Sequence, residues 1–209
     1  MELLKKYFPT LAASQTEQFA AMENLYRDWN SKINVISRQD IDQLYERHVI
    51  HSLAIAKFIS FCSGTKILDI GTGGGFPGIP LAIFFPEAEF LLADSIAKKI
   101  RVVEDVVQQL GLKNVKAQTL RVESLKGKFD FVVSRAVTRL PTMIGWTKHL
   151  ISPVQQHEIP NGLICLKGGD LNDEISTIKN KFEIIPINTW FSEHFFEKKF
   201  VVHLSVTAV

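Results

Sequence analysis

An acidic residue and three glycines occupy alternate positions at Asp69, Gly71, Gly73 and Gly75. An apolar run ends where this stretch begins and a helical pattern follows it, which is the setting of a nucleotide-binding turn. Glycines in such a turn can take positive φ angles and let the backbone approach a ligand closely. Residues 73–78 also match the dinucleotide pattern G-x-G-x-x-G, so the stretch allows two readings.

The pattern that starts at Asp69 favours S-adenosylmethionine over a dinucleotide. S-adenosylmethionine carries a sulfonium and an amino group, which a carboxylate attracts, whereas the same carboxylate repels a pyrophosphate. Pro77 lacks an amide proton near the start of the helix, where a pyrophosphate needs donors. Asp94 ends the next strand, where an acid can accept hydrogen bonds from the ribose hydroxyls of either cofactor. Asp69 could instead be only a turn residue, and Asp94 only a helix N-cap.

The residues after the fourth expected strand, Ser134, Arg135 and Ala136, narrow the chemistry. Enzymes that methylate an exocyclic amine typically carry Asn/Asp-Pro-Pro-aromatic there, and enzymes that methylate pyrimidine C5 need a nucleophilic cysteine in a loop. Cys62 and Cys165 lie in apolar surroundings that are typical of small core residues. The remaining nucleophile is an atom with a free lone pair. Guanine N7 is one such atom, and it carries no proton for a base to remove.

We therefore predict no catalytic acid or base, and no metal site. Methyl transfer then depends on holding the nucleophile and the methyl group in line at about 3–3.5 Å. Arg135 and Arg139 lie where a substrate would enter, and an arginine there can hold guanine O6 or a phosphate. Either side chain could instead form a surface salt bridge.

Short apolar runs alternate with helical stretches from residue 66 onward. We predict strands over residues 66–70, 89–93, 115–118, 129–134 and 162–167, helices over 78–85, 96–110, 140–150 and 171–181, and final strands over 182–190 and 199–206. Strands that alternate with helices imply a parallel sheet, and two final strands without a helix between them imply an antiparallel hairpin. The predicted fold class is α/β. It is a Rossmann-like doubly wound sheet with a terminal antiparallel hairpin, as in class I S-adenosylmethionine-dependent methyltransferases, preceded by N-terminal helices.

The first 60 residues have the pattern of helices. Ser14 with Glu17, and Asp40 with Gln43, have the spacing of a capping box, in which each side chain bonds a free backbone amide at a helix start. We predict an N-terminal helical extension at residues 1–63, packed on the core, and a Rossmann-like methyltransferase domain at residues 64–209.

Composition limits the remaining possibilities. The 209 residues carry 24 Lys and Arg against 22 Asp and Glu, a net charge of +2. A nucleic-acid partner would therefore have to dock on a local basic patch. The two cysteines have neither metal-ligand nor disulfide spacing, and no apolar run resembles a signal peptide or a membrane helix. We expect a soluble, cytoplasmic monomer without a membrane partner.

Motifs spread from about residue 29 to residue 203 are similar to those of one family. They are Trp29-Asn30-x-x-x-Asn34, Arg47-His48, the stretch from Asp69 to Pro80, Asp94-Ser95-x-x-Lys98-Lys99-x-Arg101, Arg121-Val122-Glu123, Ser134-Arg135-Ala136 and Lys167-Gly168. On these motifs the chain resembles the RsmG (GidB) family of bacterial 16S rRNA (guanine-N7)-methyltransferases. His51 stands where the family often has an aspartate, so we predict no acidic role at that position.

The resemblance implies S-adenosylmethionine as cofactor and N7 of a guanine in small-subunit (16S) ribosomal RNA as methyl acceptor. Together with the glycine pattern, it predicts cofactor contacts at Asp69, Gly71, Gly73, Gly75, Phe76, Asp94, Val122, Glu123 and Arg135. It also suggests that RNA or a ribosomal subunit contacts Arg47, His48, Lys98, Arg101, Arg139 and Lys167. Phosphate contacts of this kind depend on salt, and the target base has to be unstacked. Lys98 and Arg101 could instead lie on a solvated helix face, and His48 could be an ordinary helix histidine.

Two other functions are compatible with parts of the sequence. The register over residues 73–78 would suit an NAD(P)-dependent oxidoreductase, although no group of residues suited to hydride transfer is visible. A nonenzymatic RNA-binding ribosome assembly factor could have kept the same fold. The intact glycine pattern and Asp94 count against that second alternative.

Overall fold

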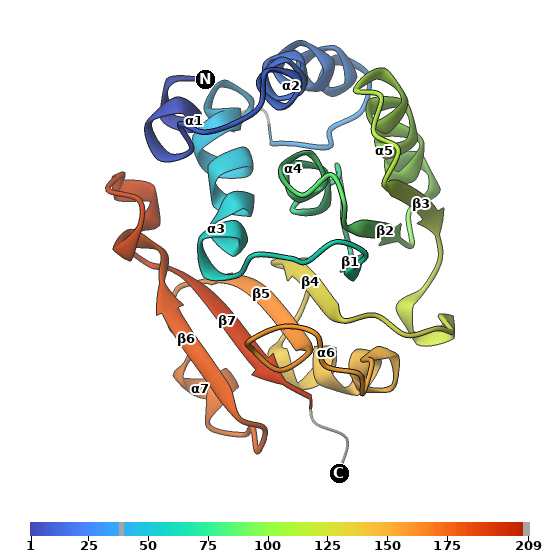
Figure 1. The fold of residues 1–209 in the computed structure, drawn as a ribbon, viewed down its shortest axis with the longest axis vertical. Helices are drawn as coiled ribbons and strands as arrows, with labels where there is room; N and C mark the ends of the chain where they lie inside the picture. Colours follow the sequence, from blue (N-terminus) through green and yellow to red (C-terminus); the bar gives the residue numbers. More distant parts are fainter. Residues whose placement is uncertain (38–39, 207–209) are drawn as a thin grey trace.

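Seven strands form one mixed sheet in a computed structural model that describes residues 1–37 and 40–206. The strand order is β3-β2-β1-β4-β5-β7-β6. The strands are β1 Lys66–Ile70, β2 Glu89–Asp94, β3 Val115–Thr119, β4 Phe131–Arg135, β5 Gly162–Gly168, β6 Phe182–Pro186 and β7 Lys199–Ser205. The first five strands are parallel, whereas β7 runs antiparallel to both β5 and β6. The predicted fold class, with its terminal antiparallel pair, is confirmed (Figure 1).

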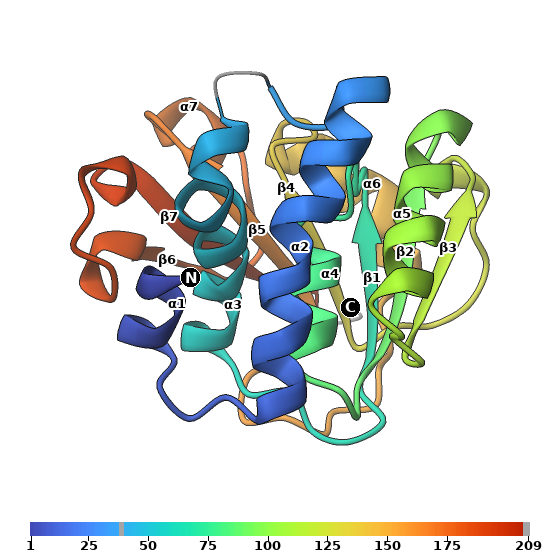
Figure 2. The ribbon, with the colours of Figure 1, turned by 90° about the horizontal axis from the view of Figure 1, so that it is seen from above.

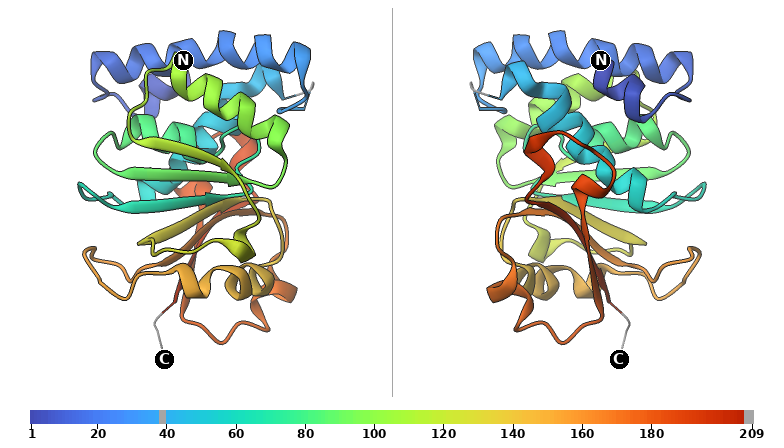
Figure 3. Two further views of the ribbon diagram at one scale, coloured as in Figure 1. Left: turned by 90° about the vertical axis from the view of Figure 1, so that its right-hand side faces the viewer. Right: turned by 90° about the vertical axis from the view of Figure 1, so that its left-hand side faces the viewer.

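Helices cover the two faces of the sheet unequally. The α-helices are α1 Glu2–Tyr7, α2 Ala13–Lys32, α3 His51–Phe58, α4 Gly78–Phe84, α5 Ala97–Gln109, α6 Leu140–Thr147 and α7 Asn172–Ile175. Figure 3 shows α3, α4 and α5 on one face with α2 outside them, and the short helices α6 and α7 on the other. Across residues 1–37 and 40–206, every helix is too short or too polar to span a bilayer.

The N-terminal helices share a hydrophobic core with the sheet. In α2, Phe19, Met22 and Tyr26 are fully buried, and they belong to the same apolar cluster as Ile79 of α4 and Ile67 of β1. Figure 2 shows α2 crossing in front of α4, between α3 and α5. The N-terminal helices are thus continuous with the sheet core, while the boundary at residues 63 and 64 stays a prediction.

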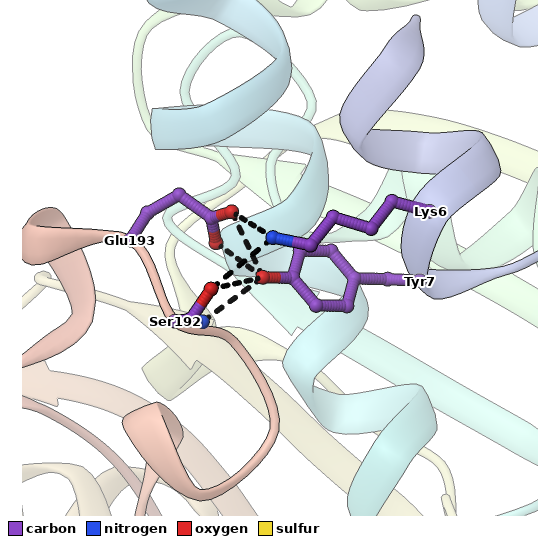
Figure 4. A network of polar contacts seen from close by, with 4 residues as sticks. All are labelled: Lys6, Tyr7, Ser192 and Glu193. Atoms are coloured by element: carbon purple, nitrogen blue, oxygen red, sulfur yellow. Dashed lines mark hydrogen bonds and ion pairs between the residues drawn. The ribbon is translucent and has the colours of Figure 1, made fainter.

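A polar cluster joins α1 to the segment between β6 and β7 (Figure 4). The Tyr7 hydroxyl donates to the Glu193 carboxylate at 2.8 Å and accepts from the Ser192 amide at 2.9 Å. The Lys6 ammonium contacts the same carboxylate at 2.8 Å. We call Lys6, Tyr7, Ser192 and Glu193 the terminal clasp.

Both predicted capping boxes are wrong. Helix α2 starts one residue before Ser14, and the Gln15 side chain accepts from the Ala12 amide at 2.9 Å. Gln15 also donates to carbonyls at the end of α4, so tertiary contacts position this helix start. Asp40 makes no side-chain cap, because its carboxylate binds the Ser37 hydroxyl and the Arg47 guanidinium. The chain after it forms a 3₁₀ turn, Ile41–Gln43, and a π-helix, η2 Leu44–Ile50, before α3.

Two further elements are shorter than predicted. The helix expected over residues 171–181 is only Asn172–Ile175, and beyond it Ser176 and Thr177 direct their hydroxyls to carbonyls of the preceding turn. The strand expected over residues 182–190 ends at Pro186, which has no amide proton to continue the ladder, and a 3₁₀ turn follows.

Candidate functional site

A cavity of about 250 Å³ opens where the carboxyl ends of β1 and β2 lie beside the chain that follows β3 and β4. Four of the predicted cofactor residues line it: Gly71, Asp94, Val122 and Glu123. Ligands bind at this edge of open α/β sheets because the loops that leave parallel strands converge there. The cavity is therefore the candidate cofactor site.

Close packing requires glycine in the loop after β1. Gly71 has φ +63°, and a Cβ atom there would lie 2.5 Å from Cγ2 of Val137. Gly75 has φ +97°, and a Cβ atom there would lie 2.4 Å from Cδ1 of Ile79. Gly71 faces the cavity, whereas Gly75 packs against α4 and Tyr26, so the alternate glycines serve different purposes.

Asp69 lies beneath the glycine loop and does not line the cavity. Its Oδ2 atom accepts from the Thr72 hydroxyl at 2.6 Å and from the Gly78 amide at 2.9 Å. Its Oδ1 atom is buried and has no hydrogen-bond partner among the residues that the structure describes. Burial raises the pKa of Asp69 to about 7 in spite of these two bonds. Asp69 thus fixes the shape of the loop. This is the role of a turn residue, which the sequence allowed as the alternative to a cofactor contact.

Asp94 combines two roles. Its Oδ1 atom accepts from the Ile96 amide at 2.9 Å, which organises the turn into α5, and its Oδ2 atom accepts from the Gly73 amide at 3.0 Å. The side chain also lines the cavity. Each carboxylate oxygen has a second lone pair, so these bonds leave Asp94 able to accept hydrogen bonds from a ligand.

Arg135 is a half-buried cation held by the N-terminal helices. Its guanidinium donates to the Arg47 carbonyl at 3.3 Å and to Nδ1 of His48 at 3.0 Å, and it lies 5.1 Å from the centroid of the Phe76 ring. Burial lowers the pKa of Arg135 to about 10, and burial together with the Arg135 charge lowers the pKa of His48 to about 3. Arg135 therefore stays charged and His48 neutral at physiological pH. Phe76 is itself covered by Tyr26, with 4.9 Å between ring centroids.

The predicted RNA contacts fall into two groups. Lys98 and Arg101 are exposed on α5, and Arg139 is exposed at the start of α6 with one bond to the Asp173 carbonyl. The side chain of Lys167 is only 9% exposed, and its ammonium binds Glu174 at 2.9 Å and the Thr138 carbonyl at 2.6 Å.

Arg47 is ion-paired with Asp40, and His48 accepts a hydrogen bond from Arg135. These internal partners argue against phosphate contacts by Lys167 and His48, whereas the exposed residues remain predicted contacts.

Sequence reasoning missed several residues that line the cavity. Val137 and Trp146 enter it from the chain after β4, and Ser95 and Leu120 enter it from the chain after β2 and β3. Arg121, which belongs to the Arg121-Val122-Glu123 motif of the sequence, lines it as well. Ala136 has φ +53°, an uncommon value outside glycine, and directs the chain so that Val137 packs on Gly71. The sequence signal that could have identified Trp146 was a tryptophan in the helix predicted after the fourth strand. Cys165 is buried, and burial raises the pKa of its thiol to about 12, which agrees with the expected core role. The same expectation is wrong for Cys62, which is exposed beyond the end of α3.

Comparisons with known proteins agree with this geometry. The family model described as rRNA small subunit methyltransferase G matches residues 15–201. A Bacteroides thetaiotaomicron protein named Ribosomal RNA small subunit methyltransferase G is 57% identical over 206 residues, which is 99% of this chain and 100% of that protein. A protein of the same name from Flavobacterium psychrophilum is 55% identical over 204 residues, with 98% and 97% covered.

Solved structures agree on the fold. A SAM-dependent methyltransferase from Aquifex aeolicus has a TM-score of 0.57 and 14% identity, covering 81% of this chain and 98% of that one. A mutant of MtNAS in complex with S-adenosylmethionine has a TM-score of 0.55 and 13% identity, covering 91% and 76%. Identities this low bear on the fold alone, whereas the family match extends over most of the chain. The chain belongs to the rRNA small subunit methyltransferase G family.

Proposed function

We propose that this protein transfers a methyl group from S-adenosylmethionine to N7 of a guanine in small-subunit ribosomal RNA. As a member of its family it is an S-adenosylmethionine-dependent methyltransferase. The observation that carries the proposal is the cavity between Gly71, Asp94 and the Val122–Ser124 turn, at the edge of the sheet where a nucleoside cofactor binds. Guanine N7 has a free lone pair, so in-line displacement proceeds without a general base and depends on alignment.

The cavity residues suggest how the cofactor lies. Asp94 would accept hydrogen bonds from the ribose hydroxyls, and Val122 and Glu123 would lie beside the adenine. Gly71 and Gly73 would let the backbone approach the methionine part. Asp69, Gly75 and Phe76 would act from below by shaping the loop, since each is buried in contacts with the protein.

Arg135 would contribute a charge to the cofactor site. No carboxylate in the described part of the chain forms a salt bridge with its guanidinium, although withdrawing a cation from water is costly unless it is paired. Val137, two residues further on, lines the cavity. The carboxylate of the methionine part of S-adenosylmethionine would supply the missing negative charge.

The exposed basic residues would hold the RNA. Lys98 and Arg101 on α5 and Arg139 before α6 are exposed near the carboxyl edge of the sheet and would contact phosphates. We further propose that the protein works as a monomer in the cytoplasm, where ribosomal subunits are assembled.

A labelling experiment tests this function. The protein is incubated with radiolabelled S-adenosylmethionine and small ribosomal subunits from cells that lack the modification, and the labelled base is then mapped. Label at guanine N7 is expected, and label at any other atom would contradict the mechanism. Tight NAD binding without label would favour an oxidoreductase, whereas RNA binding without label or cofactor binding would favour an assembly factor.

Asp94 provides the test of the cofactor site. Asp94→Ala removes the acceptor for the ribose and the bonds to the Gly73 and Ile96 amides. Loss of hydrogen bonds to a charged group costs about 1.5–3 kcal/mol, so the Kd for S-adenosylmethionine should rise roughly 10- to 100-fold. Isothermal titration calorimetry measures this change, and an unchanged Kd would refute the assignment.

A further inference from the structure

Positive charge is concentrated in β3 and in the chain on either side of it. Residues 112–128 contain the cations Lys113, Lys116, Arg121, Lys126 and Lys128 and a single acid, Glu123, although the whole chain carries a net charge of only +2. Such a local excess of charge raises the concentration of anions at that surface.

These cations are not neutralised by the protein. None of them forms a salt bridge with any residue in the ranges 1–37 and 40–206. Lys128 donates to the carbonyls of His149 and Ile151, which are neutral acceptors and leave its charge in place. Lys113, Lys116 and Lys126 are exposed.

Two of these cations, Lys113 and Lys116, line a hollow of about 510 Å³ at the amino-terminal ends of β1 and β2. It is lined by Lys66, Lys113, Lys116, Gln118 and Phe129, with Leu91 at its floor and Glu89 as its acid. The hollow exists because β3 is followed by the 3₁₀ turn η3, Val122–Ser124, where a doubly wound fold usually has a helix. Figure 1 shows α6 below β4 and β5, α7 beside β6, and the extended connection beside β3.

Strand β3 leads from the hollow toward the cofactor cavity, and the two have separate linings. Lys116 and Gln118 line the hollow, and Leu120, the next residue in the alternation, lines the cavity together with Arg121. Strand β1 gives the scale, because its five residues from Lys66 to Ile70 span about 16 Å at roughly 3.3 Å per residue. A chain of phosphates can therefore reach the hollow while one of its bases occupies the methyl-transfer site.

We propose that this hollow, defined as the basic trough of Lys66, Lys113, Lys116, Gln118 and Phe129, binds the phosphate backbone of the RNA substrate several nucleotides from the target guanine. The proposal rests on the function proposed above and names a second contact for the same substrate. Polyanionic RNA matches the charge of the trough, since its three lysines face a single acid, Glu89. The trough then sets affinity and register, while the cofactor cavity carries out the chemistry.

Paired charge deletions test the trough. The test variant is Lys113→Gln with Lys116→Gln, and the matched control is Lys179→Gln with Lys181→Gln, which removes the same charge from exposed lysines beside β6 at the opposite edge of the sheet. Binding to small ribosomal subunits that lack the modification is measured at several salt concentrations. Two lost phosphate contacts should reduce the slope of log K against log salt by roughly 1.4–1.8, whereas the control should leave it unchanged.

Kinetics and RNA length sharpen the result. For the test variant, the KM for subunits should rise while kcat and the Kd for S-adenosylmethionine stay those of the unaltered protein. The test variant and the unaltered protein should bind equally well to an RNA fragment that is too short to reach the trough. Equal salt slopes in the test and control variants would overturn the proposal. It would also be overturned if the test variant lost as much affinity for the short fragment as for whole subunits. Failure of the unaltered protein to methylate RNA would instead overturn the proposed function, and the salt slopes would still report on the trough.

Discussion

Burial sets the charge of the ionisable side chains around the glycine loop. Asp69, whose pKa burial raises to about 7, lies close to half protonated at neutral pH, whereas Arg135, whose pKa burial lowers to about 10, stays charged. His48, with a pKa of about 3, stays neutral and accepts a hydrogen bond from Arg135. The glycine loop is thus surrounded by the neutral ring of His48 and by Asp69 and Arg135, two side chains whose charged forms burial disfavours.

The state of Asp69 predicts a pH dependence of stability. The unfolded carboxyl ionises near pH 3.9, but the folded one keeps its proton up to about pH 7. Between these two pH values, ionisation of the Asp69 carboxyl stabilises only the unfolded state. Relative to Asp69→Asn, the free energy of unfolding of the native protein should therefore fall by up to about 1.4 kcal/mol per pH unit and level off above pH 7. Urea titrations from pH 5 to pH 8 measure this difference, and a constant difference would contradict the raised pKa.

Gly71 predicts a steric effect that a matched glycine isolates. Gly71→Ala and Gly64→Ala both place an alanine at positive φ, which costs about 1–2 kcal/mol. Only Gly71→Ala also places a Cβ atom 2.5 Å from Val137, and such overpacking adds about 1–3 kcal/mol. We expect Gly71→Ala to lower thermal stability further and to weaken S-adenosylmethionine binding. Adding Val137→Ala should restore part of the stability, and equal effects of the two single substitutions would contradict the steric argument.

At the scale of elements, the strands were easier to predict than the helix starts. Buried strand residues such as Leu68 and Val132 belong to continuous apolar runs, so local sequence identifies them. The start of α2 depends on Gln15 reaching the end of α4, and local spacing pointed to Ser14 instead. The π-helix η2 packs on α1, and its His48 ring lies 5.1 Å from the Phe76 ring, contacts that no local pattern records.

The same distinction between local patterns and tertiary contacts applies to the candidate cofactor site. Asp94 ends β2 and Gly71 follows β1 directly, and the sequence predicted both as cofactor contacts, which line the cavity. The burial of Arg135 against His48, and the entry of Trp146 into the cavity, depend on elements far apart in the chain. Only the tertiary structure brings these residues together.

The terminal clasp predicts the strength of the contact between α1 and the 192–193 segment. Tyr7→Phe removes bonds to a carboxylate, which should lower the free energy of unfolding by about 1.5–3 kcal/mol. Tyr45→Phe is the control, because its hydroxyl donates only to the neutral Phe19 carbonyl at 3.0 Å, a bond worth about 0.5–1.5 kcal/mol. Urea denaturation compares the two variants. A cost for Tyr7→Phe no greater than that for Tyr45→Phe would show that the clasp adds nothing beyond an ordinary hydrogen bond.

At the scale of the whole molecule, one apolar cluster links the N-terminal helices to the sheet. Tyr26 of α2 donates to the Gly74 carbonyl at 2.5 Å, so the helices also hold the cofactor loop directly. Separating the two parts would expose this cluster and release the loop. We therefore expect residues 1–63 and the sheet to unfold as a single cooperative unit.

Single-tryptophan variants test this cooperativity. One variant keeps Trp29 in α2 and another keeps Trp146 in α6, with the other two tryptophans replaced by phenylalanine in each. In both variants the urea midpoint from fluorescence should coincide with the midpoint from far-ultraviolet circular dichroism. A Trp29 signal that changes at lower urea than the circular dichroism would show that the N-terminal helices unfold first.

The terminal clasp also has a consequence for the synthesis of the protein on the ribosome. Tyr7 and Ser192 are 185 positions apart, so Tyr7 emerges long before its partner has been made. At roughly 5–20 residues per second, α1 waits roughly 10–40 s for the segment that holds it. A chain interrupted before residue 192 therefore leaves its first helix without these contacts.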